Sequence, residues 1–249
     1  MKSKLLLLTA LLLSVCGALA ADDTNAPHKI KIILVGDSTV NVGSGWGPGF
    51  TRFLTGPVEC INVAANGRSS KSYRDEGRWK KALALKGDYY LFQFGHNDEP
   101  GKGPKRETDP DTTYYTNMLR YVEETRAIGA KPVLITSLTR RKFDQDGKIK
   151  DTLGPYAEAI RRLAAAEHVP LVDLNASSIA LCEKIGPEKS WSYNHIGKDG
   201  KPSDTTHLNS EGSVVFAQLV VDGLRQAVPA LSPYLLQEPE PLPAKAKGH

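Results

Sequence analysis

The fold is decided by residues 30–39, which read Ile-Lys-Ile-Ile-Leu-Val-Gly-Asp-Ser-Thr. The first six residues are almost purely apolar, a pattern typical of a strand buried on both faces of a sheet. A glycine ends the run, and three small polar residues follow directly. Ligands of open parallel sheets bind beyond the carboxyl ends of the strands. This segment therefore predicts a buried strand and also the edge of the sheet at which a site would lie.

Short apolar runs recur along the chain and alternate with helical patterns. Further strands are predicted at 60–65, 89–94, 132–138 and 169–174. Helices are predicted at 113–128, 156–168, 177–185 and 211–227. This alternation favours an α/β fold, with a parallel sheet and helices on both of its faces.

Length and composition fit one globular domain. The chain has 249 residues, of which 40% are hydrophobic and 24% charged, so full disorder and a disulfide-dense miniprotein are excluded. Removing Lys2 and Lys4 of the leader from the 32 basic residues leaves 30 against 28 acidic ones, a formal charge of +2. That balance is too weak to indicate a nucleic-acid partner.

The N-terminus has the layout of a secretory signal peptide over residues 1–20. Lys2 and Lys4 precede an apolar run, Leu5 to Val15, and Ala18-Leu19-Ala20 provides a small-x-small cleavage site. The alternative of a membrane anchor would need about 20 apolar residues. Lipidation at Cys16 is disfavoured, because Val15 stands where a small residue is expected. We expect cleavage, a secreted or periplasmic protein and no membrane attachment afterwards.

The mature chain divides simply. We expect a loose segment at 21–28, one domain at 29–236 and a disordered, proline-rich tail at 237–249. Its two cysteines, Cys60 and Cys182, are too few for a disulfide framework.

Polar residues after the predicted strands supply the parts of a serine hydrolase. Ser38 is a candidate nucleophile, which needs a base within hydrogen-bond reach. His207 is the candidate base, and Asp204, three residues earlier, can orient its imidazole. Candidate oxyanion donors are the backbone N–H groups of Ser38 and Gly67 and the side-chain amide of Asn97. Each motif alone is weak, but their order and placement at element ends favour a common site.

Competing kinds of site fail by inspection. The G-x-S-x-G elbow of α/β-hydrolases is absent, because Val40 stands where the second glycine should be. No phosphate-binding loop is present, and neither the cysteines nor the histidines have zinc spacing. We therefore expect neither a metal ion nor a cofactor.

Taken together, these segments resemble the SGNH hydrolases of the GDSL type, and more narrowly the rhamnogalacturonan acetylesterases. The resemblance rests on Gly36-Asp37-Ser38-Thr39, Gly45-Trp46-Gly47, Gly67 to Tyr73 with Glu76-Gly77-Arg78, Phe94 to Asp98, and Asp204 to Leu208. It implies a flavodoxin-like three-layer fold whose five-stranded sheet has the order 2-1-3-4-5. It also implies hydrolysis of acetyl esters on the pectic backbone of rhamnose and galacturonate. In that strand order the two cysteines lie at opposite edges of the sheet, so we expect them unpaired.

Two residues near these motifs are candidate substrate contacts. Trp46 could stack on a sugar ring, and packing inside the core is the alternative. His96, beside Asn97, could contact the ligand or support its loop. Ser69 and Ser70 could also contact the substrate, but they are interpreted as surface serines of a turn. A long loop is expected at 189–203, where two aromatic residues could also stack on a sugar ring, with packing in the core or the loop as the alternative.

A run of three basic residues, Arg140 to Lys142, follows the predicted fourth strand. Arg140 and Arg141 could hold the carboxylate of a galacturonate unit through paired hydrogen bonds. The alternative is a solvated loop whose bases pair with Asp144 or Asp146.

The predicted function is that of a secreted, monomeric serine esterase acting on an acetylated plant polysaccharide. Alternatives remain, one within the same enzyme class and the other outside it. One is an esterase for acetyl-xylan, a lipid or a thioester. The other is a protein without catalysis, either a carbohydrate-binding protein or a nucleotide-binding flavodoxin-type protein.

Overall fold

The computed structural model describes residues 29–241. The predicted signal peptide, the segment 21–28 and residues 242–249 lie outside this range. Within the predicted tail, the backbone N–H of Glu240 donates to the carbonyl of Arg52 at 2.7 Å, and the Arg52 guanidinium donates back to the Glu240 carbonyl. Every helix in the described range falls short of the length and apolarity that crossing a membrane requires.

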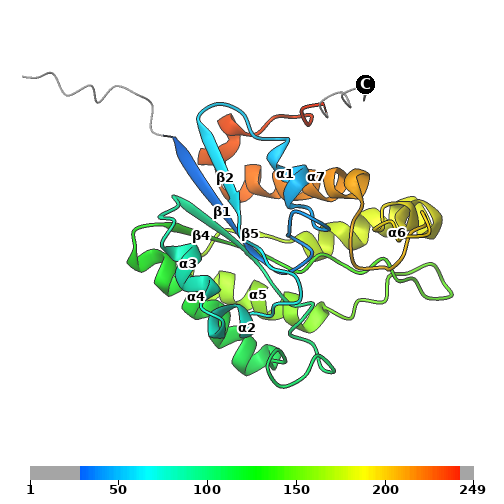
Figure 1. Ribbon diagram of the computed structural model, residues 1–249, viewed down its shortest axis with the longest axis horizontal. Coiled ribbons are helices and arrows are strands. Elements are labelled where there is room, and N and C mark those ends of the chain that lie inside the picture. The colour runs from blue at the N-terminus through cyan, green and yellow to red at the C-terminus, as the bar shows by residue number, and fades with distance from the viewer. Residues whose placement is uncertain (1–28, 242–249) are drawn as a thin grey trace, which may run out of the picture.

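Five parallel strands form the central sheet (Figure 1). They are β1 (Ile30–Gly36), β2 (Val58–Asn62), β3 (Tyr89–Gln93), β4 (Lys131–Ile135) and β5 (Leu171–Val172). Their order is β2-β1-β3-β4-β5, so the predicted flavodoxin-like parallel sheet is confirmed. Cys60 on β2 and Cys182, which follows β5, are both unpaired.

Helices cover both faces of the sheet (Figure 1). They are α1 (Gly47–Thr51), α2 (Ser72–Asp75), α3 (Arg78–Leu83), α4 (Tyr115–Ala127), α5 (Gly154–Ala166), α6 (Leu174–Ser192) and α7 (Ser210–Ala227). A π-helical turn, η1 (Pro110–Tyr114), leads into α4, and a 3-10 helix, η2 (Pro229–Tyr234), follows α7. The predicted three-layer α/β architecture is therefore confirmed.

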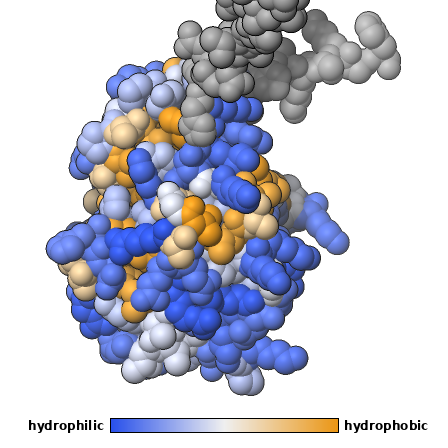
Figure 2. Space-filling model, turned by 90° about the vertical axis from the view of Figure 1, so that its left-hand side faces the viewer, coloured by the Kyte–Doolittle hydropathy of each residue, from blue (hydrophilic) through white to orange (hydrophobic). Residues whose placement is uncertain are grey.

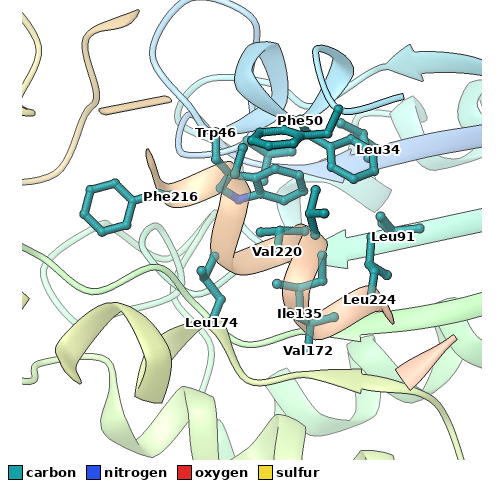
Figure 3. Close-up of a cluster of buried hydrophobic side chains, with 14 of the residues drawn as sticks. Leu34, Trp46, Phe50, Leu91, Ile135, Val172, Leu174, Phe216, Val220 and Leu224 are labelled. Carbon is teal, nitrogen blue, oxygen red and sulfur yellow. The ribbon is translucent and has the colours of Figure 1, made fainter. Parts of the chain in front are cut away.

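Alternation along the strands creates two hydrophobic cores, because successive side chains of a strand point to opposite faces. On β1, Ile32 and Leu34 join the core under α1 and α7, whereas Ile33 and Val35 join the core under α3, α4 and α5. All four residues are fully buried. Figure 3 shows the first core, in which side chains from the sheet meet those of α7. Helices held on both faces fix the carboxyl ends of the strands relative to one another.

Some predicted boundaries are wrong. The strand predicted at 169–174 is β5, only two residues long, because it pairs with β4 at two positions alone. The helix predicted at 177–185 begins at Leu174 and continues to Ser192 beyond a break at Gly186, whose φ is 81°. Pro187 can open a new helical turn, because proline suits the first position of a helix. The expected loop at 189–203 is correspondingly shorter.

Candidate active site

The candidate nucleophile lies in a tight turn directly after β1. The Oδ1 atom of Asp37 accepts hydrogen bonds from the backbone N–H of Thr39 at 2.8 Å and from its hydroxyl at 2.7 Å. These two hydrogen bonds stabilise a tight turn within two residues of the end of β1. Ser38, between them, is 7% exposed and therefore sits in a nearly closed environment.

The structure brings Ser38, His207 and Asp204 together although 169 residues separate the first two. His207 Nε2 lies 2.9 Å from Ser38 Oγ, and His207 Nδ1 lies 3.1 Å from Asp204 Oδ2. The other Asp204 oxygen accepts the backbone N–H groups of Thr206 and His207, each at 2.7 Å. Burial raises the pKa of Asp204, but these hydrogen bonds outweigh it and hold the pKa below its usual range. A negative Asp204 can therefore keep the imidazole proton on Nδ1 and leave Nε2 to accept one from the serine.

Arg141 anchors the turn that carries this histidine. Its backbone N–H donates to the Thr205 carbonyl at 2.8 Å, and its guanidinium donates to the His207 carbonyl at 2.9 Å. Further bonds join the guanidinium to the side-chain oxygen of Asn194 and to the carbonyl of Thr139. Arg141 is only 2% exposed, and burial lowers its pKa to about 10. The substrate contact predicted for Arg141 is wrong, because its donors are taken up inside the protein.

Ser38, Gly67 and Asn97 line the same pocket, and each has a hydrogen-bond donor that lacks a protein acceptor among the described residues. Among the described residues, the backbone N–H groups of Ser38 and Gly67 have no acceptor. The amide of Asn97 gives one N–H to the carbonyl of Arg68 at 3.3 Å, which leaves its second N–H. Gly67 has a φ of 73°, so this turn favours glycine for its backbone conformation. Donors held in this way can stabilise an oxyanion.

Asp98 is a residue whose importance sequence reasoning missed. It is fully buried, and its carboxylate accepts bonds from the Ser70 N–H and hydroxyl, the Thr108 hydroxyl and the backbone N–H of Gly95. Burial raises its pKa to about 7, although the hydrogen bonds from Ser70 and Thr108 lower it. Ser69 and Ser70 are completely buried as well, so their interpretation as surface serines is wrong. The only available signal was the position of Asp98 directly after Asn97.

His96 belongs to the loop of Asn97 and faces Asp37 in the loop of the nucleophile. It is 3% exposed, and its Nδ1 atom lies 3.7 Å from Asp37 Oδ2; neither of these two atoms has a hydrogen-bond partner among the described residues. Burial raises the pKa of Asp37, but His96 and Thr39 outweigh it and bring the pKa below its usual value. His96 thus supports the two loops electrostatically and also lines the pocket in front of them.

Trp46 and Arg140 depart from their predicted roles. The indole of Trp46 is completely buried, packs edge-on against Phe50 (Figure 3) and donates to Gln93 Oε1 at 2.8 Å. The prediction that it stacks on a sugar is therefore wrong. Arg140 does line the pocket, but its guanidinium is paired with Glu99 and is not a free carboxylate receptor. Its partner is neither of the two aspartates suggested by the sequence.

A hollow of about 400 Å³ joins these residues at the carboxyl ends of the strands. Its lining is Ser38, Asn66, Gly67, His96, Asn97, Lys102, Arg140, Thr206 and His207. A larger hollow of about 780 Å³ lies at the opposite end of the sheet, between the starts of β1, β3 and β4, and contains none of the candidate catalytic residues. Figure 2 shows the side of the molecule where the strands begin, with apolar patches between hydrophilic residues. The chemistry is therefore assigned to the smaller hollow.

No metal centre competes with this interpretation in the part of the chain that the structure describes. Nowhere between residues 29 and 241 do three or more His, Cys, Asp or Glu side chains gather so that they could hold a metal ion. The arrangement is suited to acyl transfer, with a nucleophile, a base, an orienting carboxylate and oxyanion donors in one pocket.

The chain is similar to several known proteins over most of its length. The rhamnogalacturonan acetylesterase RhgT of Bacillus subtilis is 36% identical over 214 residues, which cover 79% of this chain and 90% of that protein. The "Probable rhamnogalacturonan acetylesterase YesY" of the same organism is 34% identical, with 83% and 98% covered. The crystal structure of YxiM, also from Bacillus subtilis, superposes with a TM-score of 0.70 at 29% identity, covering 81% of this chain and 58% of that one. Residues 34–215 match the GDSL-like lipase/acylhydrolase family, and the chain belongs to that family.

Proposed function

We propose that this protein is a serine esterase that removes acetyl groups from the rhamnogalacturonan backbone of pectin. The observation that carries the proposal is the relay from Ser38 Oγ through His207 to Asp204, with distances of 2.9 and 3.1 Å. The substrate is inferred from the relatives named as rhamnogalacturonan acetylesterases. The signal-like leader favours action outside the cytoplasm, in the medium or the periplasm.

In the first half-reaction, Ser38 Oγ attacks the carbonyl carbon of the acetyl ester while its proton passes to His207 Nε2. Asp204 holds the imidazole in the required tautomer and stabilises its charged form. The tetrahedral intermediate then collapses, the bond to the sugar oxygen breaks, and that oxygen takes the proton from His207. An acetyl group remains on Ser38.

In the second half-reaction, water attacks the acetyl-enzyme and gives its proton to His207 Nε2. Collapse of this second intermediate returns the proton to Ser38 Oγ and releases acetate. In both intermediates the negative oxygen meets the N–H groups of Ser38 and Gly67 and the Asn97 amide. Donors fixed before the reaction need little reorganisation as charge develops, which is why such groups accelerate acyl transfer.

The test is acetate release from native rhamnogalacturonan, measured beside the same polymer after chemical deacetylation. We expect release only from the native polymer and no release by the Ser38→Ala protein. A panel of acetyl-xylan, p-nitrophenyl esters of increasing chain length and a thioester would establish substrate preference. Preference for one of those substrates over the pectic polymer would contradict the proposed substrate and leave the esterase mechanism in place.

A further inference from the structure

The candidate active-site pocket is lined by basic residues but by no acidic ones. None of the nine lining residues is acidic, whereas two, Lys102 and Arg140, are cations. The Arg140 guanidinium donates to both carboxylate oxygens of Glu99, and one of these contacts is 2.8 Å long. Lys102 is half-buried, and within residues 29–241 no carboxylate lies within 4 Å of its ammonium group. The pocket therefore presents one cation whose charge the protein does not neutralise locally.

A second cation stands beside it on the same loop. Arg106 donates from Nε to the Lys102 carbonyl at 2.9 Å, so the two residues are held together. One terminal nitrogen of Arg106 lies 3.9 Å from the place where a Cβ on Gly67 would stand. The guanidinium is thus adjacent to a candidate oxyanion donor. It likewise has no acidic partner within 4 Å in the described part of the chain.

The loop holds this position through its backbone. Gly101 and Gly103 flank Lys102 with φ values of 86° and 87°, which favour glycine. Glu107, the acid next to Arg106 in sequence, has one oxygen engaged by the backbone N–H of Gly103. The loop is therefore shaped by its own contacts, and its two basic side chains remain available to a ligand.

We propose that Lys102 and Arg106 form a carboxylate-binding subsite that recognises a uronate unit next to the acetylated sugar. The inference rests on the proposed function, because a rhamnogalacturonan backbone carries carboxylates and neutral glycans do not. Arginine can bind a carboxylate through two parallel hydrogen bonds, and lysine adds a mobile point charge. This subsite takes the role that the sequence suggested for Arg140 and Arg141.

The activity test compares two forms of one acetylated polymer, the natural acidic form and a form whose uronate carboxyls are methyl-esterified. Wild type should have the higher kcat/KM on the acidic form. Lys102→Gln should reduce the ratio of the two kcat/KM values about fivefold, the scale of a partly exposed ion pair, and Lys102→Arg should preserve it. Added salt should reduce the wild-type ratio, because exposed charges are screened beyond about 10 Å at 0.1 M ionic strength.

Lys105→Gln is the matched control, since it removes the same charge from the same loop. Lys105 is exposed and does not line this pocket. An equal fall in the ratio for Lys105→Gln would overturn the subsite. It would indicate that the positive charge of the loop attracts the acidic polymer without a specific contact. An unchanged ratio in Lys102→Gln would overturn it as well.

A binding test separates this inference from the proposed function. In a Ser38→Ala background, a galacturonate-containing oligosaccharide should bind about fivefold more weakly after Lys102→Gln or Arg106→Gln than after Lys105→Gln. Equal affinities would refute the carboxylate subsite. Wild-type protein that hydrolyses p-nitrophenyl acetate but releases no acetate from either polymer would instead refute the proposed substrate.

Discussion

The two halves of the candidate site are built differently. The nucleophile and the Asn97 amide lie in a nearly closed environment, where Ser38 is 7% and Asn97 8% exposed, and the neighbouring Asp98 is fully buried. The base lies on a surface turn, in which the side chains of His207 and Asp204 are 34% and 38% exposed. Each half nevertheless depends on one buried ionisable residue.

The buried residues act on the backbone in opposite ways. The Asp98 carboxylate collects donors from two loops and thereby fixes the Gly67 and Asn97 segments relative to each other. The Arg141 guanidinium donates to carbonyls and fixes the turn of the base. Buried charges need hydrogen-bond partners to be tolerated. The comparison teaches that oxyanion donors and base are positioned by separate polar networks that meet only across the pocket.

The largest effect should come from removing Ser38 Oγ, the atom of the buried half that contacts His207 of the surface half. Ser38→Ala should fold normally and lower kcat by about 10⁶-fold, as loss of the nucleophile does in other serine hydrolases. The measurement is acetate release at saturating substrate, with circular dichroism as the folding control. Near-normal release by a folded variant would rule out the mechanism.

A smaller loss is expected when only the buried half is impaired. Asn97→Ala should lower kcat by about 10²–10³-fold and change KM much less, because its amide meets charge that exists mainly in the transition state. Steady-state kinetics on p-nitrophenyl acetate separates the two constants. An effect restricted to KM would assign Asn97 to substrate binding or to its loop.

Impairing Arg141, which anchors the turn of the surface half, should reduce activity equally on charged and neutral substrates. Arg141→Lys should lower kcat/KM by about 10²-fold, because lysine cannot reach three oxygens in the same plane and a small displacement of the base is enough for such a loss. The fall should be equal on the acidic polymer and on p-nitrophenyl acetate. Lys142→Gln, an exposed neighbour, is the control, and a loss confined to the polymer would restore the carboxylate-binding role of Arg141.

The smallest effect concerns stability and the pKa of Asp98, raised to about 7 from an ordinary 3.8. Between these values the folded protein binds one proton more than the unfolded chain, so this group makes stability fall as pH rises. Asp98→Asn removes that dependence. Its free energy of unfolding should therefore rise relative to wild type by about 1.4 kcal/mol per pH unit between roughly pH 5 and 7. Urea titrations at three pH values test this, and a constant difference would contradict the raised pKa.

Local sequence patterns were sufficient to predict the sheet and to select the candidate residues of the site. The strand at 30–35 is recognisable because an apolar run ends at a glycine, and β1 follows it closely. The edges of β5 and α6 were misjudged, because pairing with β4 and the backbone of Gly186 set them. The short helices α1, α2 and α3 have too few residues for a helical period to show.

By itself the sequence determined the fold class and the family, and it indicated which residues lie at the ends of strands, because periodicity and residue type are local properties. Only the tertiary structure decided which basic side chain lies in the pocket without an acidic partner. Arg141 is buried against a turn more than sixty positions away, and Arg140 is paired with Glu99. Among residues 29–241, no carboxylate lies within 4 Å of the Lys102 ammonium group. These outcomes depend on which distant segments pack together, and burial and pairing therefore cannot be derived from any local stretch of the chain.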